Sequence, residues 1–161
     1  MIIEYQDSYL EKVRDLLVEL EEYIISIDQD KLDRIHPKYR EKMALFDLKE
    51  VEEKKGKCYL YLEDGQVKGM IMGIIRLYEE IDSLDYTCPK MGQITELIVS
   101  KKARSQGIGS RLIETLTSYF KEENCEYIEL DVLAYNESAI KFYKKEGYHT
   151  RMMTMIKKMK A

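Results

Sequence analysis

The segment from Ile94 to Phe120 constrains the fold of this chain most strongly, because it joins a strand pattern to a helix pattern through a glycine turn. The β-branched run at 94–99 predicts a strand, and apolar residues at helical spacing predict a helix that begins near Ile108. The turn between them reads KKARSQGIGSR, residues 101–111. Amides at a helix N-terminus lack helical acceptors and attract anions, so this turn is typical of a phosphate site, although a plain tight turn would also use the glycines.

Two familiar phosphate-binding motifs are excluded. A dinucleotide-binding fingerprint needs a third glycine at the position that Leu112 occupies. A P-loop needs Gly-Lys-Ser or Gly-Lys-Thr after four spacer residues, and the sequence contains no such run. An anion at this turn must therefore be held by another arrangement of the backbone.

The order of helix and strand patterns indicates a mixed sheet. We expect helices at residues 9–27, 39–53, 108–122 and 136–146. We expect strands at residues 2–5, 57–63, 66–78, 93–99, 127–132 and 148–159. Meander strands followed by β-α-β units predict an α/β (mixed α+β) fold with helices on both faces of the sheet. No repeat or linker interrupts the pattern, so we expect residues 1–161 to form one domain.

Composition excludes several classes of protein. The chain is 45% hydrophobic and 35% charged with two prolines, which argues against disorder. No apolar run approaches the roughly 20 residues that a membrane span needs, and the first residues are unlike a signal peptide. We therefore expect a cytoplasmic protein with no membrane partner. The basic residues are too sparse for a nucleic-acid surface, so we expect no nucleic-acid partner.

The cysteines and histidines show no metal-binding pattern. Cys58, Cys88 and Cys125 are odd in number and far apart, and His36 and His149 are the only histidines. We therefore expect reduced thiols and no bound metal. A Cys–His nucleophile pair stays open from the sequence, with no spacing in its favour.

Charge is distributed unevenly along the chain. Residues 1–53 carry 8 Lys/Arg against 15 Asp/Glu, a net charge of −7, whereas residues 54–161 carry 18 against 15, a net charge of +3. Solvated helix faces are one explanation of this division. The alternative is a divided site, in which the second part holds an anion and the first part attracts a cation. Asp28, Asp30 and Asp33 would then attract the cation, or they belong to an ordinary solvated loop.

Two motifs together resemble those of the GNAT family of N-acetyltransferases. The first, after the strand at 96–99, is similar to the family's acetyl-CoA motif and reads Val99-x4-Arg104-x-x-Gly107-Ile108-Gly109. The second reads Leu130-Asp131-Val132-x3-Asn136-x2-Ala139-x2-Phe142-Tyr143-x3-Gly147-Tyr148. The resemblance covers residues 93–148, and it implies a mixed, mostly antiparallel central sheet of six to seven strands flanked by about four helices.

The resemblance also implies an activity. Acetyl-CoA would be the co-substrate, without a metal, and the acetyl group would pass directly to a primary amine of a small molecule or peptide in a ternary complex. A cationic acceptor would suit the acidic first third of the chain. The alternative is a non-catalytic acyl-CoA-binding sensor or regulatory module, and an enzyme for a longer acyl chain also stays open. Family analogy allows a homodimer as well.

The resemblance assigns the cofactor contacts to three places. In this family the fourth strand splays from the fifth, and the pantetheine arm pairs with backbone groups that correspond to Leu97, Ile98 and Val99. The turn that would wrap the pyrophosphate consists of Arg104, Ser105, Gln106, Gly107, Ile108, Gly109 and Ser110. Arg104 would order this loop or contact phosphate, and the alternative is a surface arginine without such a role. Asn136 would contact the pantetheine or cap the next helix.

Two residues are assigned to proton transfer. The resemblance places the hydroxyl of Tyr143 beside the CoA sulfur as a general acid, whereas the alternative is a core aromatic beside Phe142. Glu96 is the candidate general base, because a strand carboxylate in the cleft can accept a proton from an amine directly or through water. Glu96 would otherwise bind a cationic substrate while water acts as the base. Only fourteen residues follow Gly147, so we expect the last strands to be short or merged.

Overall fold

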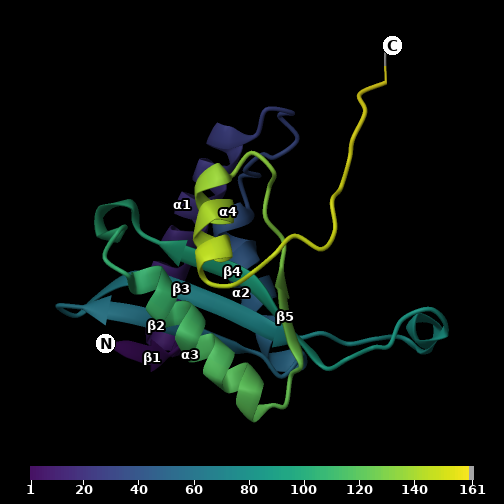
Figure 1. The fold of residues 1–161 in the computed structure, drawn as a ribbon. Helices are drawn as coiled ribbons and strands as arrows, with labels where there is room; N and C mark the ends of the chain where they lie inside the picture. Colours follow the sequence, from purple (N-terminus) through teal and green to yellow (C-terminus); the bar gives the residue numbers. More distant parts are fainter. Residues whose placement is uncertain (160–161) are drawn as a thin grey trace.

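The computed structural model describes residues 1–159 and contains a five-stranded mixed sheet (Figure 1). The strands follow the chain order across the sheet and are β1 (Ile2–Glu4), β2 (Lys57–Glu63), β3 (Gln66–Ile75), β4 (Met91–Val99) and β5 (Tyr127–Leu130). The first four strands pair antiparallel, and β5 pairs parallel with β4. The predicted mixed, mostly antiparallel sheet is therefore confirmed.

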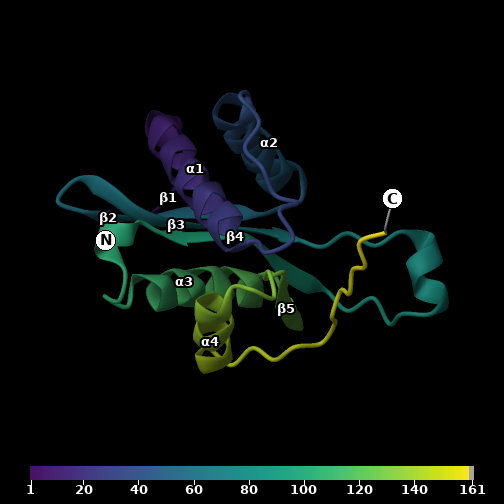
Figure 2. The same cartoon turned by 90° about the horizontal axis from the view of Figure 1, so that it is seen from above.

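Four α-helices cover the two faces of the sheet (Figure 2). One face carries α1 (Leu10–Ile27) and α2 (Tyr39–Glu53), and the other carries α3 (Ile108–Glu122) and α4 (Glu137–Lys145). Short 3₁₀ turns, labelled η1 to η3, occur at Asp7–Tyr9, Glu80–Leu84 and Lys101–Ala103. The predicted arrangement of helices on both faces is confirmed.

Each face of the sheet has its own hydrophobic core. Leu17 of α1 and Met72 of β3 are buried in the first core. Leu116 and Phe120 of α3 are buried in the second, against Ile71 of β3. Alternate residues of β3 thus point to opposite cores, as the two-residue period of a strand requires. Because the central strands are buried on both faces, they form a rigid support for the side chains of β4 that are described below.

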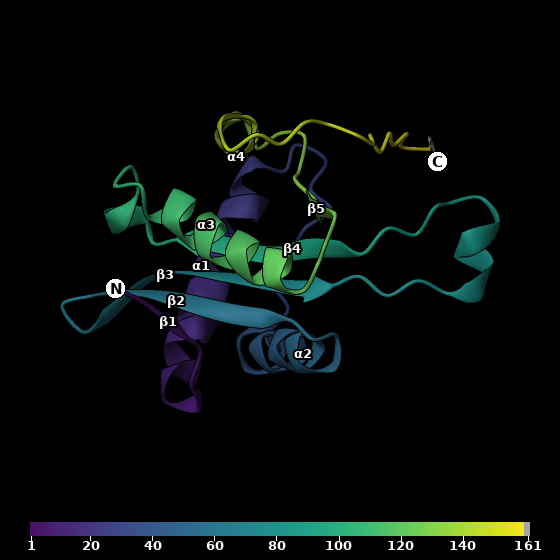
Figure 3. The ribbon, with the colours of Figure 1, turned by 60° about the horizontal axis from the view of Figure 1, so that its bottom comes forward.

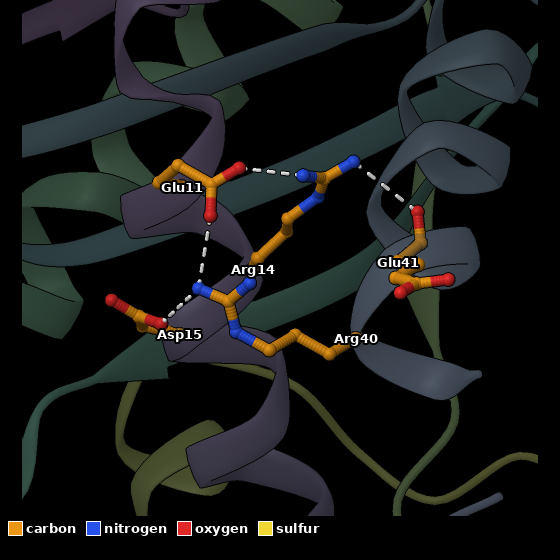
Figure 4. A network of polar contacts seen from close by, with 5 residues as sticks. All are labelled: Glu11, Arg14, Asp15, Arg40 and Glu41. Carbon is orange, nitrogen blue, oxygen red and sulfur yellow. Dashed lines mark hydrogen bonds and ion pairs between the residues drawn. The ribbon is translucent and has the colours of Figure 1, made fainter. Parts of the chain in front are cut away.

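A polar network joins α1 to α2 at the surface (Figure 4). The Arg40 guanidinium on α2 donates to Glu11 at 3.0 Å and to Asp15 at 2.8 Å, both on α1. Arg14 of α1 donates to Glu11 at 2.5 Å and to the Glu41 carbonyl oxygen at 3.3 Å. Exposed ion pairs contribute little free energy individually. Their value here is geometric, because they link two helices that form one wall of the cavity described below.

The edge of β4 next to β5 is only partly paired. Parallel pairing runs from Met91 opposite Tyr127 to Ile94 opposite Leu130, where β5 ends. The register with β3 shifts where Met72 faces Glu96 and Gly73 faces Ile94, so Thr95 is an extra residue, a β-bulge. A bulge bends its strand and breaks the hydrogen-bond ladder. Beyond Ile94 the two strands therefore separate, as expected from the family resemblance.

The segment after α4 differs from the prediction. We expected a strand at 148–159, and this prediction is wrong, because no regular secondary structure forms there. The sheet accordingly has five strands within residues 1–159 rather than six to seven. Met152, Met153 and Met155 are all exposed. Their apolar character suggested a strand, but they have no core to pack against.

Elsewhere the differences concern the ends of elements. β3 ends at Ile75 rather than at residue 78, β4 begins at Met91 rather than at residue 93, and β5 ends at Leu130 rather than at residue 132. The loop between β3 and β4 projects from the body of the molecule and contains η2 (Figures 1 and 3).

Candidate active site

A cavity of about 300 Å³ lies where β4 and β5 separate. The strands contribute residues 94–97 of β4, Leu130 of β5 and residues 131–133 after it. The helices contribute Leu20, Glu21 and Ile24 of α1, Tyr39 and Met43 of α2, and Ala139 and Tyr143 of α4 with its N-cap Asn136. The cavity thus collects groups from both faces of the sheet, and it includes both residues that we assigned to proton transfer.

Glu96 contributes its carboxyl group to this cavity from β4. Burial, together with the negative charges of Asp47 and Glu21, raises the pKa of Glu96 from 4.5 to about 8. Desolvation and like charges both penalise the ionised carboxylate, which is why the two effects act in the same direction. A carboxyl group with a pKa near the working pH is suited to accept and release a proton.

Tyr143 lies on α4 and lines the same cavity. Burial is the main cause that raises its pKa to about 12, with further contributions from Tyr148 and Glu96. Its ring packs against Phe142 at a centroid distance of 5.4 Å and against Tyr148 at 5.8 Å. The aromatic packing fixes the ring, and the raised pKa keeps the phenol protonated at neutral pH. Tyr143 is therefore both a packed aromatic residue and a hydrogen-bond donor at the cavity wall.

Two further acidic residues of the cavity were not predicted. Glu21 of α1 lines the cavity, and burial and the charge of Asp33 raise its pKa. Asp131 follows β5 and lines it as well. Within residues 1–159, no lysine, arginine or histidine lines this cavity. The cavity is thus an acidic pocket that favours a positively charged guest.

Little in the sequence indicates that α1 and α2 contribute side chains to the cavity. Glu21 follows Leu20 at the border of the apolar stripe of α1, where a carboxylate normally faces solvent. Tyr39, the first residue of α2, also lines the cavity, and burial together with the charges of Glu21, Glu96 and Asp47 raises its pKa. These residues are far from the two motifs in the sequence, and only the packing of the helices on the sheet brings them to β4.

The predicted pantetheine contacts lie along the separated edge of β4. Leu97 lines the cavity, whereas the side chain of Ile98 is buried in the core beneath α1 and α2. Val99 packs against the other core, and its carbonyl oxygen accepts a hydrogen bond from Arg104 at 3.0 Å. Because β5 does not extend beyond Leu130, the outer edge of these residues has no strand partner within residues 1–159. An extended ligand with amide groups could pair there.

The glycine turn presents backbone amides at the start of α3. Gly107 is the N-cap in the left-handed region with φ of 74°, and no side chain caps the helix. Ser105 also has positive φ, at 64°. The amides of residues 106–110 donate to no group within residues 1–159. A helix N-terminus with free amides is an anion-binding arrangement.

The two glycines of the turn have different structural reasons. A Cβ on Gly107 would meet no atom within 4 Å, so its positive φ is the reason for glycine. A Cβ on Gly109 would lie 3.1 Å from Cζ of Phe142, so close packing of α3 against α4 is the reason there. Ser110 reinforces this packing, because its hydroxyl donates to Glu146 at 2.6 Å. The turn is thereby attached to the helix that carries Tyr143.

Arg104 orders the loop that precedes α3. Its Nε donates to the Val99 carbonyl oxygen, and its Nη2 lies 3.9 Å from Glu19 of α1. Its guanidinium also lies over the ring of Tyr23 at 5.3 Å from the centroid. These contacts fit the loop-ordering alternative of the sequence analysis. The side chain is otherwise exposed beside the free amides of the turn.

Asn136 caps α4 at the wall of the cavity. Its Oδ1 accepts hydrogen bonds from the Ala139 amide at 3.2 Å, from the Tyr23 hydroxyl at 3.1 Å and from Ser138 at 3.1 Å. The capping alternative is therefore present in the structure. Because Asn136 also lines the cavity, a contact with pantetheine remains compatible with the cap.

The aspartates between α1 and α2 have structural partners. Asp28 accepts hydrogen bonds from the backbone amides of residues 30, 32 and 33, and these bonds lower its pKa. The hydroxyl of Tyr135 donates to Asp30 at 2.8 Å. The charge of Asp28 is thus used by its own loop, and the acidity of the cavity comes from Glu21, Glu96 and Asp131 instead.

Residues 1–159 contain no group of three or more His, Cys, Asp or Glu arranged to hold a metal ion. None of the helices in this part of the chain is both long and apolar enough to cross a bilayer. The three cysteines are free thiols.

Comparison with known proteins identifies relatives of the chain. The model of the acetyltransferase (GNAT) family matches residues 13–148. An uncharacterized N-acetyltransferase of Methanocaldococcus jannaschii is 38% identical over 98 residues, which are 60% of this chain and 55% of that protein. An N-alpha-acetyltransferase of Sulfurisphaera tokodaii is 30% identical over 127 residues, 78% of this chain and 72% of that protein. This chain therefore spans about half the length of the first relative.

A solved structure extends the similarity to the whole chain. The tetramutant of the BH1408 protein from Bacillus halodurans superposes with a TM-score of 0.84 and covers 99% of both chains. Its sequence identity is 20%, so this similarity concerns the fold alone.

Proposed function

The chain belongs to the acetyltransferase (GNAT) family, and on that premise we propose that it transfers an acetyl group from acetyl-CoA to a primary amine in a ternary complex. The acceptor amine would lie in the cavity, and the proposal treats residues 1–161 as one acetyltransferase domain. The observation that carries the proposal is the acidic cavity at the end of the β4–β5 pairing, which contains Glu96 and Tyr143.

The residues of the turn and of β4 would bind acetyl-CoA. The free amides of residues 106–110 would hold the pyrophosphate, with Arg104 beside them. The unpaired edge at Leu97 to Val99 would hold the pantetheine, which brings the thioester toward Tyr143. Acetyl-CoA supplies the activated acetyl group. The role of the protein is to orient it and to exclude water from the pocket.

The acidic residues would prepare the amine. A primary amine enters as an ammonium ion, which the carboxylates at Glu21 and Asp131 attract. Glu96, with its pKa near 8, then accepts a proton directly or through water, which leaves the nitrogen lone pair free to attack. Because a bound ammonium ion itself stabilises the carboxylate, a larger fraction of Glu96 is ionised and able to accept a proton when the site is filled.

Tyr143 would stabilise the leaving thiolate. Its phenol has a pKa of about 12, well above that of an ordinary thiol. Complete proton transfer to sulfur is therefore uphill, but a short hydrogen bond to the developing thiolate is favourable. Amides at the β4 edge would stabilise negative charge on the thioester oxygen in the same way as an oxyanion hole.

We further propose that the acceptor is the α-amine of a peptide. The support is the relative from Sulfurisphaera tokodaii, which is named an N-alpha-acetyltransferase. The acidic cavity suits a peptide whose ammonium end enters first. A small-molecule amine is the second candidate acceptor, and a non-catalytic acyl-CoA sensor is the alternative function.

The test combines binding and thiol release. Acetyl-CoA affinity is measured by calorimetry, and CoA release is followed with three acceptors: a short peptide, the same peptide with a blocked α-amine and a free lysine, and a diamine. Release with the first peptide alone supports an α-amine acceptor. Release with the diamine alone selects the small-molecule candidate. Tight binding without release from any of the three supports the sensor, and the absence of binding contradicts the acetyl-CoA assignment.

A further inference from the structure

Tyr23 of α1 contacts both motifs of the cofactor region. Its ring lies under the guanidinium of Arg104 at 5.3 Å, next to the glycine turn. Its hydroxyl lies 3.1 Å from Oδ1 of Asn136 and 3.2 Å from Oγ of Ser138, at the start of α4. Arg104 and Asn136 are separated in sequence by α3 and β5. One side chain from a third element therefore connects them.

A second residue of α1 supports the same loop. Glu19 lies one turn before Tyr23, and its Oε1 accepts a hydrogen bond from the Lys101 amide at 2.7 Å. The same oxygen lies 3.9 Å from Nη2 of Arg104. The beginning of the turn is therefore attached to α1 through both its backbone and its arginine side chain. α1 also provides Glu21 to the acceptor cavity, so one helix contacts the cofactor and acceptor sides.

The end of the glycine turn is also joined directly to α4 and to its C-cap. Ser110 donates to Glu146, and Gly109 packs closely against Phe142. Tyr23 provides the matching connection between Arg104 and Asn136. These two connections link the free amides of the turn to the Asn136 side chain and to the helix that carries Tyr143.

We propose that Tyr23 is a positioning residue for acetyl-CoA, which sets the spacing between the glycine turn and the start of α4. This inference rests on the proposed function, since it presumes that acetyl-CoA contacts both places. A site that is already ordered loses less conformational entropy when the ligand binds, and affinity rises accordingly. Tyr23 acts through Arg104 and Asn136 and takes no part in proton transfer.

The test compares two substitutions at this position. Tyr23→Phe keeps the ring beneath Arg104 and removes the bond to Asn136, whereas Tyr23→Leu removes both contacts. We expect the Kd for acetyl-CoA to rise roughly three- to tenfold in Tyr23→Phe, the equivalent of one hydrogen bond, and further in Tyr23→Leu. The kcat at saturating acetyl-CoA should stay within about twofold of wild type, because the proton-transferring groups are intact.

Tyr135→Phe is the matched control. Like Tyr23→Phe, it removes a phenol hydroxyl that bonds across the molecule. The lost bond joins Tyr135, in the segment after β5, to Asp30 in the loop after α1. Its Kd for acetyl-CoA should equal that of wild type. An equal rise in this control would overturn the proposal, because it would indicate general loosening of α1. The melting temperatures of Tyr23→Phe and Tyr135→Phe should agree closely.

Two results would contradict the positioning role of Tyr23 while leaving the proposed function intact. These are an unchanged Kd in both Tyr23 variants, and a lower kcat with unchanged Kd, which would place Tyr23 at the chemical step. Failure of the proposed function has a different signature, since the wild-type chain itself would then either not bind acetyl-CoA or bind it without releasing CoA to any acceptor. If Tyr23→Leu does not fold, Tyr23→Phe decides the question, because it preserves the ring and its packing.

Discussion

Glu96 and Tyr143 reach the same cavity from two different elements, Glu96 from β4 and Tyr143 from α4. Their pKa values are raised to about 8 and about 12, respectively, and burial is the main cause for both. One group is thus ready to exchange a proton near neutral pH, while the other keeps its proton. This separation matches the roles of a base and a hydrogen-bond donor.

Tyr143→Phe should lower turnover and leave binding intact. The substitution keeps the ring that packs against Phe142 and Tyr148 and removes only the hydroxyl. We expect kcat to fall roughly 10- to 1000-fold, because the departing thiolate loses its hydrogen-bond donor. The Kd for acetyl-CoA by calorimetry and the melting temperature should change little. Unchanged turnover with a good acceptor would assign proton donation to water.

Tyr148→Phe is the control for this substitution. Tyr148 packs against Tyr143 and also has a pKa raised to about 12, mainly by burial, but it does not line the cavity. Its kcat should be near that of wild type. A loss equal to that of Tyr143→Phe would indicate that the aromatic packing, rather than the hydroxyl, is required.

Glu96→Gln should reduce activity more at neutral than at alkaline pH. At neutral pH the acceptor is mostly an ammonium ion and needs a base, whereas above its own pKa the free amine is already abundant. We therefore expect the ratio of wild-type to variant kcat/KM to decrease between pH 7 and pH 9.5. The measurement is CoA release across this range. An equal loss at every pH would instead assign Glu96 to substrate binding.

Sequence patterns predicted the parts of the site that are local in the chain. Gly107, Asn136 and Tyr143 each lie in a short motif whose spacing reflects a turn or a helix. In the structure Gly107 begins α3, and Asn136 and Tyr143 line the cavity. The contacts of Glu21 and Tyr23 were not predictable in this way. They depend on how α1 packs on the sheet, and an amphipathic pattern indicates which face is buried but not which neighbours it meets.

In the segment after α4, the sequence predicted a strand that does not form. Residues 152–156 are rich in methionine and isoleucine, and this composition suggested a strand at 148–159. A strand also needs a partner edge of sufficient length, and β5 is only four residues long. Composition alone carries no information about that edge, because pairing in a sheet depends on distant residues.

Glu96→Gln should also stabilise the fold at high pH. The folded-state pKa of Glu96, about 8, lies above its ordinary value of 4.5, so the folded chain binds more protons than the unfolded chain between these values. The stability associated with Glu96 is therefore fully present below about pH 4.5 and is lost as pH rises through about 8. The upper bound of this loss is about 5 kcal/mol. Glutamine does not ionise, so the Glu96→Gln variant should not show this loss of stability as the pH rises.

The measurement is thermal unfolding of both proteins at pH 5 and pH 9. The melting temperature of Glu96→Gln relative to wild type should be higher at pH 9 than at pH 5. Other titrating groups are common to both proteins, so the difference isolates Glu96. A constant difference between the two pH values would show that the Glu96 carboxyl group is well solvated.

The glycine turn can be tested without disturbing the packing of α3. A side chain at Gly109 would press on Phe142, so Gly109→Ala should affect stability as well as binding. Gly107→Asn is the cleaner substitution, because asparagine tolerates positive φ and no atom lies within 4 Å of the new Cβ. The added side chain should obstruct phosphate at the free amides and raise the acetyl-CoA Kd at least about tenfold. Normal binding by a folded Gly107→Asn would mean that the glycine only shapes the turn.

Asp47→Asn should lower the pKa of Glu96. Asp47 is buried on α2, its Oδ2 has no hydrogen-bond partner within residues 1–159, and burial and the charge of Glu50 raise its own pKa to about 6. It is therefore mostly ionised at neutral pH, and its charge is the second cause, after burial, of the raised pKa of Glu96. Without that charge, Glu96 should ionise at lower pH.

The kcat–pH profile of Asp47→Asn, measured at saturating acceptor, should therefore rise at lower pH than that of wild type, with a similar plateau. Glu21→Gln provides the comparison, because Glu21 also contributes to the pKa of Glu96 but lines the cavity directly. It should shift the profile in the same direction and additionally raise the KM for a cationic acceptor. Identical profiles for wild type and Asp47→Asn would show that solvent screens the two carboxyl groups from each other, which would leave burial and the charge of Glu21 to account for the raised pKa of Glu96.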